Sequence, residues 1–505
     1  MAEVRWRQRV FIGVSIAAAM SPVVQPAAAT AAPLPKTVTT AMATATTTAL
    51  TASPASSSYD SPVMFTAHVS APSGTPAGSV IFTDTSNGSI LDTATLSSGT
   101  ASFSTAALAP GTRSIVARYG GSSTFSPSSS AAVRIPVAAA GSPAVTYQTD
   151  PRHDGDQAQG TLKASSLTRK WTVTLGGTGS FNYESGAVSY PLIARGRVFV
   201  TVENAQTGGS KLYALNASTG AIDWTVGLGG MYGFSALAYD GGRVFAVNFS
   251  GILTAFAAST GQELWAVQLG QSTAPPTAYD GVVYASTSGV GGTVFAVSEA
   301  DGVIRWGVQV LNGDESSPAV DDTGAYVSYA CQQDYRFSLS GARAWYHSTS
   351  CEGGGGSTPV LHGSSLYTRG ATATDTPLIL SKSAGTLTGT FASATAPAFD
   401  GTSMYTLWDG NLAAVDPSGS PNRWTFRNGS LVTAPVVNGG VVYAGSSSGK
   451  VYGLSASSGA KVWTGTAGPK ILKPDEFGPD VLTGMAIGGG LLVVPAGNQL
   501  TAFGG

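Results

Sequence analysis

Apolar and polar residues alternate along residues 46–137, as expected for strands that bury one face. Gly, Pro, Asp and Asn interrupt this alternation and divide it into seven segments: TTALTAS, PVMFTAHVS, GSVIFTD, SILDTAT, TASFST, TRSIVARY and AAVRIPV. Seven short strands in about 90 residues predict an immunoglobulin-like β-sandwich. The range contains no cysteine, so burial alone has to hold the two sheets together.

A longer pattern begins near residue 166. LYALNASTGAIDW at 212–224 returns as LTAFAASTGQELW at 253–265, VFAVSEADGVIRW at 294–306 and VYGLSASSGAKVW at 451–463. A turn such as YDG or VNG and a further apolar strand precede these copies. A period of about 40 residues with four strands per unit predicts the blades of a β-propeller.

The two ends of this repeat region are complementary. LTRKWTVTLG at 167–176 is a tryptophan strand with no blade before it, and 482–503 supplies three strands and then stops. Joined, they complete one blade and remove the open sheet edges. We therefore expect an all-β fold, in which an Ig-like sandwich precedes an eight-bladed β-propeller closed by pairing of its N- and C-terminal strands.

The repeat places a small residue, a glycine and a tryptophan at fixed offsets, as in Ala214, Gly220 and Trp224. A glycine permits a tight turn and lets a flat ring approach the backbone closely. We expect structural docking roles for seven tryptophans: Trp171, Trp224, Trp265, Trp306, Trp345, Trp424 and Trp463. Three blades depart from the pattern: Tyr335 takes the small position in the fourth, Gly389 replaces tryptophan in the fifth, and Trp424 comes one residue late in the sixth.

These motifs carry two resemblances. SPVMFTAHVS, AGSVIFTD and GTRSIVARYGGSSTFSPS resemble bacterial Ig-like repeats, which usually serve as spacers or adhesive units. The tryptophan-docking pattern resembles that of pyrroloquinoline-quinone (PQQ)-like eight-bladed propellers. That group includes dehydrogenases as well as cofactor-free binding proteins, such as the scaffold lipoprotein of the outer-membrane barrel assembly machine. The resemblance therefore implies the fold and leaves the cofactor open.

The dehydrogenase interpretation makes specific demands on the sequence. The resemblance implies a tryptophan that stacks on the quinone inside the channel, a calcium site, and, in the alcohol-oxidising branch, adjacent cysteines. Here Cys331 and Cys351 are far apart, and there is no Cys-x-x-Cys-His haem motif. Apart from Trp6 in the N-terminal segment, only Trp408 is left over after docking. We expect no cofactor, with PQQ and calcium as the alternative.

The N-terminus predicts export. Arg5, Arg7 and Arg9 precede the apolar segment 10–20, and small residues follow at 26–32. The expected domains are a signal peptide (1–31), an Ala/Thr/Pro-rich linker (32–45), the Ig-like sandwich (46–137), a second linker (138–165) and the propeller (166–505). The protein is expected to be secreted or otherwise extracytoplasmic. In an oxidising compartment, Cys331 and Cys351 predict one disulfide.

Composition limits the classes of partner that the protein is expected to bind. Charged residues make up 11% of the chain and the net charge is −2, which argues against nucleic acid. No later apolar segment is long enough to span a membrane. We also expect the protein to be a monomer. The four histidines are scattered, and no nucleophile elbow or phosphate loop is present.

The loops carry the functional hint. In a propeller, the connections from each outer strand to the next inner strand share one face. A candidate ligand-binding rim falls in these connections: Tyr183, Glu184, Tyr232, Asp314, Glu315, Glu352, Asp475 and Glu476. We expect a secreted, non-catalytic binding or scaffold protein that presents the propeller face to a protein or carbohydrate ligand. The alternatives are a PQQ- and calcium-dependent alcohol or sugar dehydrogenase and a glycan-active enzyme with paired carboxylates.

Overall fold

The computed structural model describes residues 43–505 apart from the gaps 59–61, 87, 106–107, 109–110, 139–142, 158–159, 161, 177–185, 204–208, 231–234, 272–273, 289–291, 312, 314–315, 350–355, 371–374 and 477–480. The expected signal peptide and most of the first linker lie outside the described residues. Within the described part the only helix is a short 3-10 turn, η1 (Ala164–Ser166), and no helix has the length and apolarity of a membrane span.

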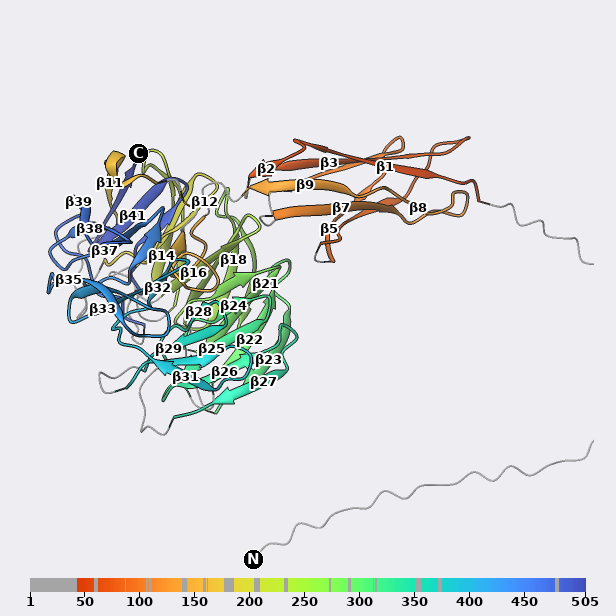
Figure 1. The fold of residues 1–505 in the computed structure, drawn as a ribbon. Coiled ribbons are helices and arrows are strands. Elements are labelled where there is room, and N and C mark those ends of the chain that lie inside the picture. Colours follow the sequence, from red (N-terminus) through yellow and green to blue (C-terminus); the bar gives the residue numbers. More distant parts are fainter. Residues whose placement is uncertain are drawn as a thin grey trace, which may run out of the picture.

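The N-terminal module is a pair of β-sheets (Figure 1). Alternating residues of both sheets face inward, and Phe65, Phe82, Ile115 and Ile135 are completely buried between them. One sheet consists of β1 (Thr47–Ser53), β3 (Val63–Ser70) and β6 (Thr100–Thr105). The other has the order β2 (Ser57–Ser58), β9 (Val133–Ala138), β7 (Gly111–Tyr119), β4 (Ser79–Asp84) and β5 (Ser89–Thr95), with β8 (Ser128–Ser129) paired to β7.

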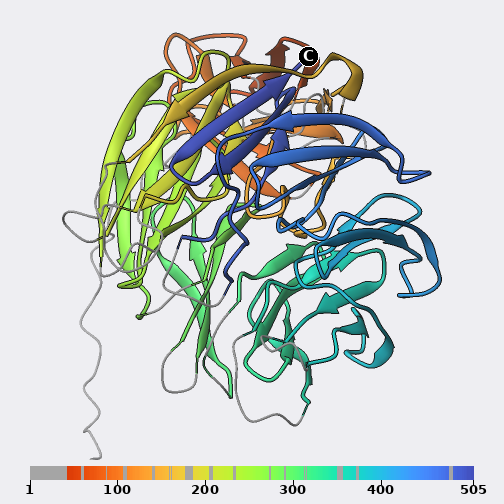
Figure 2. The ribbon, with the colours of Figure 1, turned by 90° about the vertical axis from the view of Figure 1, so that its left-hand side faces the viewer.

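The rest of the chain forms antiparallel sheets around a common axis (Figure 2). Seven blades follow one another in the sequence, each running from the innermost to the outermost strand. Their strands are β12 (Leu192–Ala194), β13 (Arg197–Glu203), β14 (Ser210–Asn216) and β15 (Ile222–Gly229); β16 (Ser235–Asp240), β17 (Arg243–Asn248), β18 (Ile252–Ala257) and β19 (Glu263–Gln268); β20 (Thr277–Tyr279), β21 (Val282–Thr287), β22 (Thr293–Ser298) and β23 (Ile304–Gln309); β24 (Ala319–Asp321), β25 (Gly324–Tyr329), β26 (Gln333–Phe337) and β27 (Arg343–His347); β28 (Val360–His362), β29 (Ser365–Thr368), β30 (Leu378–Ser381) and β31 (Leu387–Thr390); β32 (Ala398–Phe399), β33 (Met404–Trp408), β34 (Asn411–Val415) and β35 (Asn422–Phe426); β36 (Val436–Asn438), β37 (Val441–Gly445), β38 (Lys450–Ser455) and β39 (Lys461–Thr466).

The eighth blade combines both ends of the repeat region. β40 (Ala486–Gly488), β41 (Leu491–Ala496) and β42 (Gln499–Gly504) are completed by β11 (Thr168–Thr174), which runs antiparallel to β42. Trp171 of β11 lies opposite Ala502, the same pairing as Ala255 with Trp265 in the second blade. The innermost strand β12 contacts β16 on one side and β40 on the other, so the ring is closed as the sequence predicts.

Each docking tryptophan joins its blade to the next one. The ring of Trp265 lies over the turn glycine of the third blade, where a Cβ on Gly302 would come within 2.7 Å of the ring, and Gly302 has a φ of +74°. The indole Nε1 donates to a backbone carbonyl of that neighbour. The seven donor–acceptor pairs are Trp171–Ala217, Trp224–Ala258, Trp265–Glu299, Trp306–Leu339, Trp345–Lys382, Trp424–Ala456 and Trp463–Leu167.

The irregular blades differ in detail from the sequence prediction. Opposite Trp345 in the fourth blade stands Arg336, not Tyr335, because the turn before this tryptophan is one residue shorter than in the regular blades. In the sixth blade Trp424 lies opposite Ala414, in the ordinary register. Trp424 is late only when it is counted from the turn glycine, because Gly419 stands one residue nearer to Ala414 than the turn glycines of the regular blades stand to their small residues. Gly389 does take the tryptophan position of the fifth blade, opposite Ile379.

Residues 143–157, which the sequence places in a linker, are built into the propeller. We call them the axial segment. Its carbonyls accept hydrogen bonds of 2.7–2.9 Å from the innermost strands of six blades. The acceptors are Ala144, Val145, Pro151, Arg152, Asp154 and Gly155, and the donors are the backbone N–H groups of Ile193, Tyr239, Val320, Leu361, Phe399 and Val437. Its end, β10 (Asp156–Gln157), adds a parallel strand to β36.

Side chains of the axial segment reach the two remaining blades, the third and the eighth. Thr146 donates to the carbonyl of Pro276, and His153 Nε2 lies 3.1 Å from the Thr277 hydroxyl at the start of the third blade. Tyr147 packs at an angle against Tyr190 and would meet a Cβ on Gly484 beside the eighth blade. Tyr147 and His153 are completely buried, so the axial segment fills the middle of the ring instead of linking two modules.

Candidate functional site

We call the propeller face that carries the connections between blades the loop face, and the opposite face the turn face. The axial segment contacts the innermost strands near the turn face, because its hydrogen-bond partners Tyr239, Val320 and Leu361 lie at or near the last residues of β16, β24 and β28. A cleft of about 970 Å³ opens near the loop face, between the fifth and sixth blades and the connection after β39. This cleft is the candidate functional site.

A small residue on the sixth blade widens the cleft. Ala413 takes the position next to the tryptophan pair that Tyr213, Phe295 and Tyr452 take in the first, third and seventh blades. The face of β34 that carries Ala413 and Val415 therefore lines the open space. On the fifth blade Gly389 replaces the docking ring, but a Cβ there would meet the Ser418 carbonyl at 3.3 Å, so the turn of the sixth blade takes up that space.

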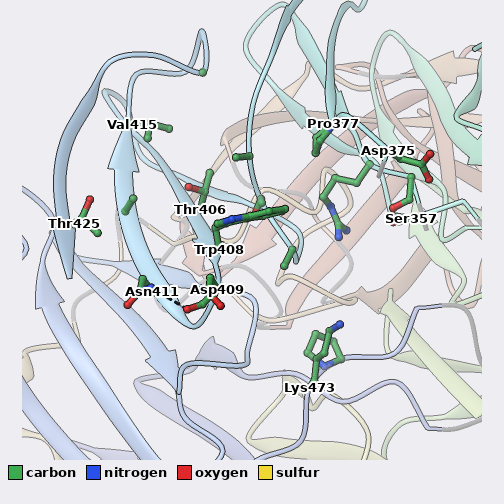
Figure 3. A pocket seen from close by; sticks show the side chains of 18 of the residues that line it. Ser357, Asp375, Pro377, Thr406, Trp408, Asp409, Asn411, Val415, Thr425 and Lys473 are labelled. Carbon is green, nitrogen blue, oxygen red and sulfur yellow. Dashed lines mark hydrogen bonds between the residues drawn. The ribbon is translucent and has the colours of Figure 1, made fainter. Parts of the chain in front are cut away.

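Among the described residues Trp408 is the one tryptophan that bridges no blades, and it lies at this cleft. It is the last residue of β33, and the two-residue hairpin of Asp409 (φ +48°) and Gly410 (φ +68°) follows it. Both positive φ values are those of a type I′ turn, which keeps the strands in register and pairs Trp408 with Asn411. Its side chain is 50% exposed, and the indole projects into the cleft (Figure 3).

Asn411 fixes the floor beside this ring. Its Oδ1 accepts from the backbone N–H groups of Asn428 (2.9 Å) and Gly429 (3.1 Å), and its Nδ2 donates to the carbonyl of Asp409. These bonds tie the connection after β35 to the hairpin that carries Trp408. The ring is therefore presented by rigid backbone and not by a loose loop.

The connection after β39 closes the cleft on its other side. Lys473, Pro474, Asp475 and Glu476 line it, and Lys473 faces the Trp408 region in Figure 3. The Glu476 side chain is 5% exposed. Its Oε1 and Oε2 accept hydrogen bonds from Arg369 Nη2, at 2.8 and 3.0 Å. Glu476 Oε2 also accepts from the backbone N–H of Thr358 at 2.7 Å. The buried ion pair anchors this connection to the fifth blade.

Only two residues of the predicted ligand-binding rim are among those that the structure describes. Asp475 and Glu476 line the cleft, whereas Tyr183, Glu184, Tyr232, Asp314, Glu315 and Glu352 lie outside the described residues. Cys331 is buried, but Cys351 also lies outside the described residues, so their disulfide stays a prediction. No cluster of three His, Cys, Asp or Glu side chains suited to a metal ion occurs within the described ranges.

A second, smaller pocket of about 430 Å³ lies on the turn face beside the axial segment. Its charged side chains are largely paired with each other. Arg152 donates to Asp150 at 2.7 Å and approaches Asp154 at 3.4 Å, and Lys382 forms an ion pair with Asp321. These pairs hold the axial segment and the neighbouring turns together, which gives this pocket a structural explanation.

One buried carboxyl breaks the apolar pattern between blades. Asp334 on β26 takes the register position of Leu212, Leu253 and Val294 in the first three blades and is 0% exposed. Its Oδ2 accepts from the Thr368 hydroxyl at 3.1 Å, while Oδ1 has no hydrogen-bond partner among the described residues. Burial raises the pKa of Asp334 to about 7.

This pKa predicts a pH-dependent stability that one substitution removes. Between the unfolded pKa near 4 and about 7, the unfolded chain loses the Asp334 proton first, so rising pH destabilises the fold. Asp334→Asn keeps the shape and removes the ionisation. We expect it to raise the free energy of unfolding by about 1–3 kcal/mol at pH 8, and by little at pH 4.5. Denaturant unfolding at both pH values measures this, and an equal effect at both would contradict it.

Comparisons with known proteins place the two modules. Residues 50–138 match the family of bacterial Ig-like domains (group 3). Residues 158–328, 249–425 and 335–504 match the PQQ-like repeat family described as outer membrane protein assembly factor BamB. The chain belongs to this propeller family. Together the three matched segments cover the propeller from end to end. Among curated proteins, no sequence matches this chain.

Solved structures agree with this fold at low sequence identity. BamB from Moraxella catarrhalis is 16% identical with a TM-score of 0.50, over 67% of this chain and 100% of that one. The quinohemoprotein alcohol dehydrogenase of Comamonas testosteroni is 12% identical with a TM-score of 0.55, over 72% and 80%. The computationally designed Ika8 protein is 13% identical with a TM-score of 0.52, over 66% and 99%. At such identities the likeness shows the fold alone.

Proposed function

We propose that this chain is an extracytoplasmic, non-catalytic binding protein whose propeller holds a ligand in the cleft beside Trp408. The observation that carries the proposal is the contrast between the two faces of the propeller. Its own axial segment fills the middle near the turn face, while a large cleft with a half-exposed tryptophan opens near the loop face. Concave sites of this size that combine an aromatic ring with a few polar groups are typical ligand sites. The export signal expected at 1–31 supports the location.

A quinone enzyme is the main alternative, and the residues present do not fit it. The resemblance implies a tryptophan stacked on the quinone within the channel. Seven tryptophans instead bridge neighbouring blades, and the eighth in the described residues, Trp408, lies in the cleft between two blades. Tyr147 and His153 of the axial segment occupy the middle of the ring, and burial lowers the pKa of His153 to about 3, so it stays neutral.

A glycan-active enzyme is the second alternative, and it needs two carboxyl groups free to act as acid and base. Of the acidic side chains that line the cleft, Glu476 is bound on both oxygens by Arg369 and the Thr358 backbone. A carboxylate held by these three hydrogen bonds is not free to turn toward a glycosidic bond. This arrangement supports binding over hydrolysis.

Two assays on the purified, full-length mature protein test the proposal. Titration with PQQ and calcium should give no saturable change in the quinone absorbance and no dye reduction with alcohols or sugars. Incubation with polysaccharides should release no reducing ends. Saturable quinone binding with dye reduction would establish the dehydrogenase, and released reducing ends that disappear in Asp409→Asn or Asp475→Asn would establish the hydrolase.

A further inference from the structure

The lining of the cleft has an unusual composition for a protein-binding site. Of the described residues that line it, none is Leu, Ile, Met or Phe. The apolar residues are three alanines, two prolines, one valine and Trp408, and the polar ones include hydroxyl and amide side chains such as Thr406, Thr425 and Asn422. Thr406 and Thr425 flank the cavity on the β33–β35 side in Figure 3. The surface is therefore hydroxyl-rich around a single flat ring.

We propose that the cleft binds a neutral carbohydrate chain, with a sugar ring stacked on the indole of Trp408. This inference rests on the proposed binding function and specifies its ligand class. A sugar ring presents an apolar face of C–H groups and an edge of hydroxyls. An exposed indole offers a matching apolar face, and its amphipathic character suits a site that stays wet. The threonine and asparagine side chains supply both hydrogen-bond donors and acceptors for the sugar hydroxyls.

A peptide ligand fits these walls less well. Tight protein interfaces depend on a few large side chains buried in apolar pockets. In this cleft the wall of the sixth blade is cut back to Ala413, and no cluster of large aliphatic side chains offers such a pocket within the described lining. Many small hydrogen bonds around one ring match a saccharide better than they match the anchor residues of a peptide.

Charge favours a neutral saccharide over an acidic one. The charged side chains that line the cleft are Arg369, Arg427, Lys473, Asp375, Asp409, Asp475 and Glu476, four acidic against three basic. The Arg369 guanidinium is already paired with Glu476. A polyanionic chain rich in uronic acids or sulfates would meet more negative than positive charge, and binding would be weakened.

The test is a glycan array that contains neutral, uronic-acid and sulfated oligosaccharides, probed with the full-length mature protein. Wild type should bind a neutral set. Trp408→Ala should weaken that binding at least about tenfold, the loss of one aromatic contact of about 1.4 kcal/mol. Trp408→Phe, which keeps a flat ring, should retain most of the affinity. Ile222→Ser changes an exposed side chain on the first blade and serves as the matched control, with unchanged binding.

A peptide library displayed on phage, selected on the same protein, separates the two levels of inference. Peptides that bind through Trp408, with no saccharide retained on the array, would overturn the carbohydrate assignment and leave the binding function standing. Saccharide binding unaffected by Trp408→Ala would overturn the assignment of the cleft. Retention of neither saccharides nor Trp408-dependent peptides would overturn both. Melting curves of each variant, expected to match wild type, exclude loss of folding as the cause.

Discussion

A chain that begins at residue 160 will lose the cooperative unfolding of the propeller, whereas one that begins at residue 143 will keep it. The difference is the axial segment, whose carbonyls accept hydrogen bonds from the N–H groups of six inner strands. A buried donor left without a partner costs about 1–3 kcal/mol, and domains have only about 5–15 kcal/mol of net stability. Loss of six acceptors together with the buried Tyr147 and His153 therefore approaches the whole stability of the ring.

Calorimetry or circular dichroism melting of the two truncated chains measures this directly. Both lack the Ig-like module, so any difference between them belongs to residues 143–159. The full-length mature protein provides the reference for a propeller that retains every contact. If both truncated chains melt cooperatively at the same temperature, the axial segment is dispensable and its hydrogen bonds are replaced by water.

The sequence could not reveal the axial segment, for a physical reason. PAVTYQTDPRHDGDQ has neither strand alternation nor helical periodicity, and its polar residues are typical of a linker. Its role depends mainly on backbone carbonyls, which every residue has. The blades can be predicted because they depend on side chains: apolar strands and tryptophans recur about every 40 residues. The pairing of β11 with β42 likewise follows from the incomplete ends of the repeat region.

The candidate site was visible in the sequence only as separate departures. Gly389 breaks the tryptophan period and Trp408 stands outside it, and both facts can be read from the printed chain. That the cleft opens beside Ala413, and that the turn at Ser418 packs against Gly389, follows only from the fold. Likewise the position of Glu476 in the chain predicts a place on the ligand-binding rim, but only the fold reveals its ion pair with Arg369.

This pairing changes what a substitution at the rim is expected to do. Glu476→Gln would leave the Arg369 guanidinium buried without its partner carboxylate, so it would weaken the fold as well as any ligand contact. Asp475→Asn alone is therefore the better probe of ligand binding at this connection.

Trp265→Ala is expected to lower the free energy of unfolding by about 3 kcal/mol, the lower end of the range for loss of a buried tryptophan. The ring is only partly buried, but it covers the backbone of Gly302 and donates through Nε1 to the carbonyl of Glu299 at 2.9 Å. Its removal opens the interface between the second and third blades and leaves that carbonyl without its donor. Denaturant unfolding monitored by far-UV circular dichroism gives the value.

Trp408→Ala is the matched control, because it deletes the same side chain at a position that is half exposed and bridges no blades. Surface substitutions of this kind usually change stability by less than about 0.5 kcal/mol. The docking role requires a clear gap between the two variants, since tryptophan content and mass change equally in both. If Trp265→Ala and Trp408→Ala unfold at the same denaturant concentration, the ring contacts between blades contribute nothing measurable, and closure of the propeller has to rest on the inner strands and the axial segment.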